Sequence, residues 1–162
     1  MTEELEDLYR EVILDHTKRP RNFREMGDAN RVADGYNRLC GDKLKLYARI
    51  EDGVIRDISF KGSGCSISTA SASMMTEALK GKRVEDAHEL FHKFHDVLTG
   101  PPDEVPKTDE LGKLAAFHGV RRFPIRVKCA TLAWHTLEAA LNNQTDKEVS
   151  TEGAMGDGPH RT

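Results

Sequence analysis

The sequence predicts an α+β domain in which about three antiparallel strands form a sheet and helices pack on one of its faces. Two observations support this class. After a first helix, alternating apolar and polar residues predict strands, and from residue 65 onward the periodicity is helical. Strands that are followed by a run of helices, rather than alternating with them, are typical of α+β domains.

The first expected element is an amphipathic helix that begins after Thr2 and is stopped by Pro20. The hydroxyl of Thr2 can cap this helix, and the acidic residues that follow complement the positive end of the helix dipole. Apolar residues and one histidine recur on one face: Leu5, Leu8, Tyr9, Val12, Ile13 and His16. Residues 21–38 are polar and irregular, and we expect a short strand near residues 32–36.

Two strands joined by a tight turn are expected next. Apolar residues alternate with polar ones over residues 44–50, which is the period of a half-buried strand. Asp52-Gly53 is typical of a hairpin turn. The partner strand covers residues 54–60 and ends at a Gly-Ser-Gly segment.

Helical periodicity then continues to residue 141. Helices are expected over four ranges, namely residues 65–79, 84–98, 109–117 and 125–141. The tail, residues 142–162, is polar, Gly-rich and without periodicity, so we expect it to be disordered. Residues 1–141 are therefore expected to form a single domain.

The composition of the 162 residues excludes several classes of function. Charged residues make up 31% of the chain, and no apolar run approaches the roughly 20 residues that a membrane helix needs. A net charge of -3 and a pI near 6.2 give no electrostatic basis for binding nucleic acid. The first 15 residues lack the pattern of a signal peptide, which predicts a cytoplasmic protein.

Three cysteines carry the functional hypothesis: Cys40, Cys65 and Cys129. An odd number of cysteines in a chain expected in the reducing cytoplasm disfavours disulfides. Metal binding, nucleophilic chemistry or both remain as functions for these thiols.

The first two cysteines lie next to flexible backbone. Cys40 and Asp42 flank Gly41, so a tight turn can aim a thiolate and a carboxylate at one metal, although Gly-Asp is also a common turn sequence. Cys65 follows Gly64 at the start of an expected helix, where free backbone amides favour a thiolate over a thiol. The alternative for Cys65 is a small apolar residue that closes the core.

Cys129 is expected near the start of the last helix, after Pro124 and between Arg126 and Lys128. These two cations favour the anionic form of its sulfur. The alternative is a cysteine that fills the core against Trp134.

Three thiolates brought together would repel one another unless a cation joined them. Zn²⁺, at about 2.3 Å from each sulfur, would be such a cation. Asp42 is the preferred fourth ligand because it is nearest in sequence, and His118 and His135 are the alternatives. Three further histidines at helical spacing are interpreted as the polar edge of an apolar stripe rather than as a second metal site: His88, His92 and His95.

Motifs across most of the chain occur in a specific order. They are Val12-Ile13-Leu14-Asp15-His16, Pro20-Arg21-Asn22, Asn37 with Cys40-Gly41-Asp42, Phe60 to Ser68, Ala70 to Thr76 and Arg122 to Ala130. Together they resemble the IscU, or NifU-like, family of iron-sulfur cluster assembly proteins, over residues 5–141. The long stretch between Cys65 and Cys129, and Lys128 before the last cysteine, are similar to the SufU branch of that family. Arg38 departs from the family pattern, which usually has Pro at this position.

The resemblance implies an IscU/SufE-like fold and a zinc site made by four side chains: Cys40, Asp42, Cys65 and Cys129. It also implies a SufS-type cysteine desulfurase, a pyridoxal-phosphate enzyme, as the partner, and a downstream iron-sulfur scaffold or apo-protein as the recipient of the sulfur. Cys40 would accept persulfide sulfur after a desulfurase histidine replaced it on the zinc, which would make the protein a zinc-dependent sulfurtransferase. Arg126 is a candidate for steadying the negative sulfur or the partner contact.

Two other functions stay open for the same four residues. An IscU-type scaffold would assemble a [2Fe-2S] cluster on them, since such clusters use thiolate ligands as zinc does. In a purely structural protein, zinc would only stabilise the fold, and an Asp ligand makes this reading less favourable.

Overall fold

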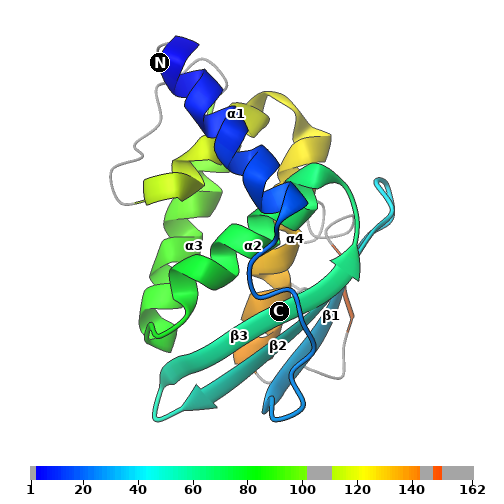
Figure 1. Ribbon diagram of the computed structural model, residues 1–162, viewed down its shortest axis with the longest axis vertical. Coiled ribbons are helices and arrows are strands. Elements are labelled where there is room, and N and C mark those ends of the chain that lie inside the picture. Colours follow the sequence, from blue (N-terminus) through cyan, green and yellow to red (C-terminus); the bar gives the residue numbers. More distant parts are fainter. Residues whose placement is uncertain (1–2, 102–110, 143–147, 151–162) are drawn as a thin grey trace.

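The computed structural model describes residues 3–101, 111–142 and 148–150. The elements follow the order α1 (Glu3–Lys18), β1 (Arg31–Asn37), β2 (Asp42–Glu51), β3 (Val54–Ser63), α2 (Ser66–Leu79), α3 (Val84–Thr99), η1 (Gly112–Arg122), α4 (Pro124–Leu141) and β4 (Glu148–Ser150). The expected α+β class with an antiparallel three-stranded sheet is confirmed, with helices on one side of the sheet (Figure 1).

The sheet has the strand order β3-β2-β1-β4. The first three strands pair antiparallel, as predicted. The short strand β4 pairs parallel with β1, with Gly35 opposite Val149. For these three residues the structure has a strand where the sequence led us to expect a disordered tail, and residues 143–147 and 151–162 lie outside the described part of the chain.

The hairpin between β2 and β3 is turned by the two residues that the sequence predicted. Asp52 and Gly53 both have positive φ angles, 54° and 74°. Two consecutive left-handed residues match the right-handed twist of the flanking strands. The turn pairs Glu51 with Val54, and a bulge between Arg49 and Ile50 then shifts the register by one residue, so that Lys43 lies opposite Ser63 at the end of β3.

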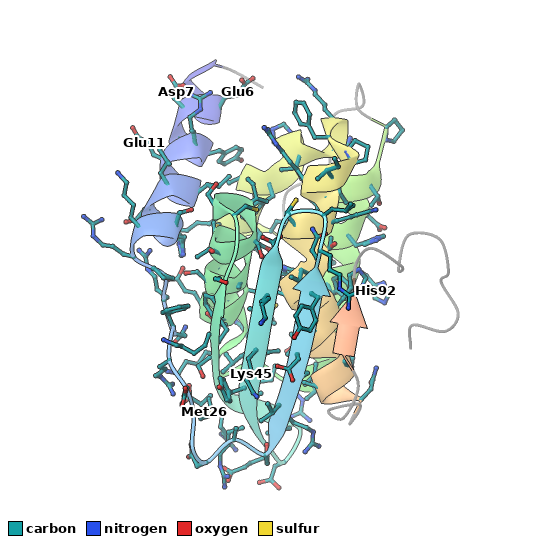
Figure 2. The ribbon with its side chains drawn as sticks, turned by 90° about the vertical axis from the view of Figure 1, so that its right-hand side faces the viewer. Glu6, Asp7, Glu11, Met26, Lys45 and His92 are labelled. Atoms are coloured by element: carbon teal, nitrogen blue, oxygen red, sulfur yellow. The ribbon has the colours of Figure 1, made fainter. Side chains whose placement is uncertain are left out.

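The inner face of the sheet is apolar and is covered by α2 and α4. Leu46 and Ala48 of β2 are fully buried, whereas Lys45, which precedes Leu46, is exposed (labelled on the sheet in Figure 2). Trp134 of α4 is fully buried and stacks on Phe94 of α3, with their ring centroids 4.9 Å apart. Helix α1 packs on α2, and α3 packs on α4 and η1.

Segment η1 differs from the expected helix over residues 109–117. It is a 3₁₀ helix over Gly112–Arg122, and residues 109 and 110 are not among those described. Gly112 has a φ of 56°, which neither an α-helix nor a 3₁₀ helix adopts, so it marks the start of the segment, and the first i to i+3 bond runs from Leu114 N–H to Leu111 C=O. The guanidinium of Arg121 donates to the carbonyls of Val97 and Pro101 and so ties η1 to the end of α3.

The described helices include none that is both long and apolar enough to cross a bilayer.

Candidate metal centre

The turn between β1 and β2 carries the first two candidate ligands. Asn37 ends β1 and pairs with Asp42, which begins β2. Two backbone bonds close the turn, from Cys40 N–H to Asn37 C=O and from Gly41 N–H to Arg38 C=O, both 3.3 Å. Gly41 has a φ of 70°, the left-handed conformation that favours glycine. The turn therefore leaves Cys40 half-buried at its tip and Asp42 buried at its base.

Cys65 reaches Asp42 because β3 ends beside the start of β2. Its backbone N–H donates to Asp42 Oδ1 at 2.8 Å, and its Sγ lies 4.0 Å from Asp42 Oδ2. Cys65 is also the N-cap of α2, where its Sγ accepts a bond from Ser68 N–H at 3.4 Å. The predicted position at a helix start is confirmed.

Cys129 approaches the same point from α4. It is 2% exposed, and its Sγ lies 3.1 Å from the Sγ of Cys40. The side-chain Nδ2 of Asn37 donates to this sulfur at 3.4 Å. Cys129 therefore forms the buried wall of the cluster, while Cys40 lies nearer the solvent.

The four sequence-predicted residues lie together, from three separate parts of the chain. The ligand atoms of Cys40, Asp42 and Cys129 are all within 4.8 Å of one another, and Cys65 joins them through its contacts with Asp42 and Cys129. Within the described ranges, no other group of three or more His, Cys, Asp or Glu side chains converges this closely. Soft sulfur donors with one carboxylate suit a divalent transition metal.

The cysteines of the cluster do not ionise equally. The hydrogen bond from the Cys129 thiol, together with that from Ser68 N–H, lowers the pKa of Cys65 to about 7. The same bond to Cys65, together with burial, raises the pKa of Cys129 well above its ordinary value. A second and third sulfur anion thus need a cation between them.

The expectation that Arg126 and Lys128 favour a Cys129 thiolate is not met, because the neighbours that dominate its pKa are Cys65, Cys40 and Asp42. Arg126 is exposed on the first turn of α4, and its guanidinium lies over the ring of Phe123, 4.5 Å from the centroid. Its supporting role in sulfur chemistry stays a prediction.

The alternative ligands pack elsewhere. The ring of His118 lies edge-on to Tyr9, with centroids 6.2 Å apart, and His135 lies edge-on to Phe91 at 5.2 Å. Neither histidine belongs to the convergent group.

The three histidines of α3 take part in pairwise contacts. His88 Nδ1 lies 2.5 Å from Glu138 Oε2 on α4, and His95 packs edge-on against Phe91. His92 stacks on the same phenylalanine. These contacts agree with a polar edge beside the apolar stripe.

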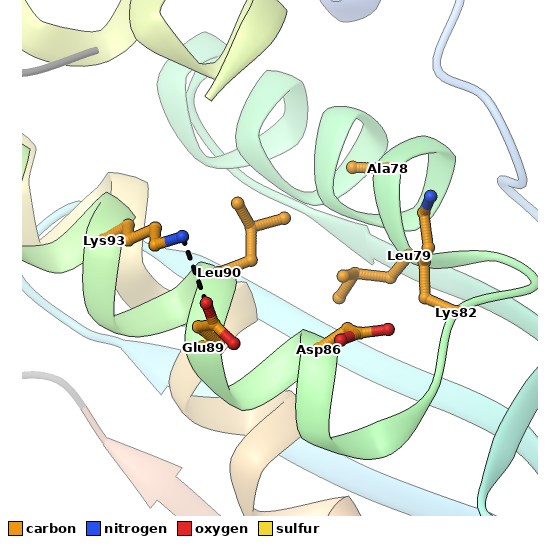
Figure 3. Close-up of a pocket in the computed structure, with 7 residues that line it drawn as sticks. All are labelled: Ala78, Leu79, Lys82, Asp86, Glu89, Leu90 and Lys93. Carbon is orange, nitrogen blue, oxygen red and sulfur yellow. Dashed lines mark hydrogen bonds and ion pairs between the residues drawn. The ribbon is translucent and has the colours of Figure 1, made fainter. Parts of the chain in front are cut away.

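A shallow depression of about 270 Å³ lies between the end of α2 and α3 (Figure 3). Its lining mixes apolar and charged side chains: Ala78, Leu79, Lys82, Asp86, Glu89, Leu90 and Lys93. Since α2 begins next to Cys65 and rises about 1.5 Å per residue, the depression is roughly 20 Å from the cysteines. It is not part of the candidate metal centre.

Sequence reasoning missed two residues that shape the cluster. Asn37 contacts Cys129 across 92 positions of sequence, a contact that no local pattern indicates. Gly64 packs against Asp42 so closely that a Cβ there would lie 2.5 Å from Asp42 Oδ1. From the sequence alone, Gly64 indicates only a flexible backbone before Cys65.

The four residues of the cluster all lie within a segment that matches a known protein family. Residues 8–130 match the family described as NifU-like N terminal domain. The chain is 46% identical over 137 residues to the zinc-dependent sulfurtransferase SufU of Bacillus subtilis, covering 85% of this chain and 91% of that protein. It is 38% identical over 154 residues to the iron-sulfur cluster assembly scaffold protein IscU of Streptococcus pyogenes, covering 95% of each.

A solved structure supports the fold assignment. The chain superposes with a TM-score of 0.75 and 35% identity on a protein of Fervidobacterium islandicum described as an iron-sulfur cluster assembly scaffold protein for the SUF system. The match covers 81% of this chain and 94% of that chain.

Proposed function

Because this chain belongs to the family of NifU-like N-terminal domains, we propose that it is an iron-sulfur cluster assembly protein that accepts persulfide sulfur on Cys40. The sulfur would come from a SufS-type cysteine desulfurase, and a scaffold or apo-protein would receive it. The observation that carries the proposal is the meeting of Cys40, Asp42 and Cys129 within 4.8 Å, with Cys65 against Asp42. Similarity to a zinc-dependent sulfurtransferase supports it.

The residues of the cluster fit a zinc ion. Three sulfurs and one carboxylate supply four donors, the number that zinc takes in a tetrahedral site. Without a cation, the hydrogen bond to the Cys65 sulfur and then burial raise the pKa of Cys129, so a divalent ion would stabilise the thiolate form that this cluster otherwise disfavours. When bound, zinc would hold the sulfurs as thiolates and restrain their nucleophilicity.

Cys40 is the sulfur best placed to react with a partner. It is half-buried on a turn, whereas Cys129 is buried in α4 and Cys65 caps α2. In the transfer, the Cys40 thiolate attacks the terminal sulfur of the desulfurase persulfide. The S–S bond of the desulfurase breaks, its cysteine leaves as a thiolate, and Cys40 becomes the persulfide. Asp42, Cys65 and Cys129 remain as the other members of the cluster.

Cys40→Ala tests this assignment. We expect the variant to retain much of its zinc, because three donors remain, and to lose persulfide transfer completely. Zinc content is measured by elemental analysis, and transfer by the turnover of the desulfurase and by mass spectrometry of trapped persulfide. Ser66→Ala is the matched control, because Ser66 is exposed one position after Cys65. Normal transfer by Cys40→Ala would contradict the assignment.

A scaffold that builds a [2Fe-2S] cluster on the same ligands is the second candidate, and the similarity to proteins named as scaffolds favours it. Anaerobic purification followed by metal analysis and an absorption spectrum separates the two. Colourless protein with one zinc supports sulfur transfer. Brown protein with iron and inorganic sulfide supports the scaffold.

The place of action proposed for the protein is the cytoplasm. All three cysteines are free thiols, which a reducing compartment maintains.

A further inference from the structure

We propose that Asn37 is a positioning residue of the metal centre, whose carboxamide N–H group fixes the Cys129 sulfur in the geometry that binds zinc. This inference rests on the proposed function, because it concerns the same metal. It assigns to Asn37 a role that acts through Cys129 and not by contact with the metal.

The first argument is the position of Asn37. Asn37 is fully buried, and its Nδ2 donates to Cys129 Sγ at 3.4 Å. Its backbone carbonyl accepts the N–H of Cys40, and its strand partner is Asp42. One residue thus bonds to Cys129 through its side chain and to Cys40 through its backbone carbonyl, and it lies opposite Asp42 in the sheet.

The second argument is the cost of burying this side chain. Asparagine is disfavoured in strands, and a buried amide oxygen without a partner destabilises a fold. Asn37 Oδ1 is buried and has no hydrogen-bond partner among the described residues. Packing alone would favour an apolar side chain at this position. Among the described contacts of the carboxamide, the bond to the Cys129 sulfur is the one that accounts for a buried asparagine here.

The third argument is the chemistry of the sulfurs. A thiolate that binds a metal gains from an N–H donor, which orients its lone pairs and offsets its charge. Cys65 has such a donor in Ser68 N–H. Cys129 is buried and lies past the first turn of α4, where the helix amides bond along the helix axis, so its donor has to come from another element. Asn37 supplies it.

Asn37→Leu and Asn37→Val test the inference. Leucine is close to asparagine in size and lacks the donor, and valine suits a strand. We expect both to weaken zinc binding on the order of 10- to 100-fold, measured by competition with a chromophoric chelator. With Co²⁺ in place of zinc, the sulfur-to-metal charge-transfer band should move to lower energy, because a thiolate without a donor is more easily oxidised.

Ser71→Ala is the matched control. Ser71 is also fully buried and joins α2 to α4 by donating to Ala130 C=O, but has no described contact with a sulfur. It should lower stability while leaving the cobalt band at the wild-type position. A packing role for Asn37 would make its variants behave like this control.

A measurement on the unaltered protein keeps the test independent of how the variants fold. In protein loaded with ¹¹³Cd, a scalar coupling between the metal and one side-chain amide proton of Asn37 is expected across the N–H···S bond. Absence of this coupling, or variants with wild-type zinc affinity and cobalt spectrum, would overturn the inference and leave the proposed function intact. Wild-type protein that does not bind zinc would instead overturn the proposed function.

Discussion

Gly64 shows how one missing side chain shapes the candidate centre. A Cβ at this position would lie 2.5 Å from Asp42 Oδ1 and 3.2 Å from Asp42 Cα, which leaves the carboxylate no room. The glycine therefore permits the N–H of Cys65 to reach Asp42 at 2.8 Å. The close approach, and not a left-handed backbone, is what requires glycine here.

Gly64→Ala should therefore weaken metal binding and destabilise the protein by about 1–3 kcal/mol, the usual range for overpacking. Zinc titration and urea denaturation measure the two effects. Gly27→Ala is the control, because nothing lies within 4 Å of a Cβ built at Gly27. Equal zinc affinity in the two variants would show that Asp42 is free to move and that the packing argument is wrong.

At the scale of elements, the sequence predicts what depends on local periodicity. The ends of α3 and of the β2–β3 hairpin lie within three residues of their predicted positions, because amphipathic patterns and Asp52-Gly53 are local signals. The pairing of β4 with β1 and the 3₁₀ form of η1 were not predicted. The first depends on contacts between residues far apart in sequence. For the second, the apolar periodicity of so short a segment does not distinguish an α-helix from a 3₁₀ helix.

The candidate site likewise has some features that follow from neighbouring residues and others that depend on residues distant in sequence. The settings of Cys40 at a turn and Cys65 at a helix start follow from neighbouring glycines. The pKa of Cys129 does not, because it depends on the Cys65 sulfur across the fold rather than on the adjacent Arg126 and Lys128.

The packing of α1 on α2 includes a titratable group. His16 is 1% exposed, its Nδ1 lies 2.7 Å from Ser73 Oγ, and its Nε2 has no hydrogen-bond partner among the described atoms. Burial, followed by the charge of Arg21, lowers the pKa of His16, and the carboxylate of Glu77, 3.7 Å from Nε2, only partly opposes this. The folded protein therefore holds His16 neutral.

The stability of the protein should consequently fall as the pH drops below about 6.5, the pKa of an unperturbed histidine, toward the lower pKa of folded His16. In this window the unfolded chain binds more protons than the folded one, so the free energy of unfolding rises with pH. Burial also lowers the pKa values of His95 and His118, which act in the same direction.

His16→Asn should reduce this slope, because asparagine can bond to Ser73 but does not titrate in this range. Urea denaturation of both proteins between pH 5 and 8 measures it. An unchanged slope in the variant would assign the effect to the other histidines.

On the scale of the whole molecule, the candidate centre joins parts that are distant in sequence. The β1–β2 turn, the junction of β3 with α2, and α4 meet at one end of the sheet, and 89 positions separate Cys40 from Cys129. A metal bound there would connect the sheet to the two helices that cover it. Folding stability and metal affinity are then linked, since the unfolded chain does not hold these donors together.

Removal of the metal should therefore lower the melting temperature of the whole domain, and not only loosen one turn. At free zinc 100 times its dissociation constant, the stabilisation is about 2.7 kcal/mol. Each kcal/mol shifts the midpoint by roughly 2–4 °C in a chain of this size, so zinc-loaded protein should melt roughly 5–10 °C above the chelated form. Differential scanning calorimetry at several zinc concentrations measures the shift. Mg²⁺ serves as the control cation, because it prefers oxygen ligands to thiolates and should give no shift. A midpoint that does not respond to zinc would show that the four side chains do not act together as a metal site, whatever their distances in the structure.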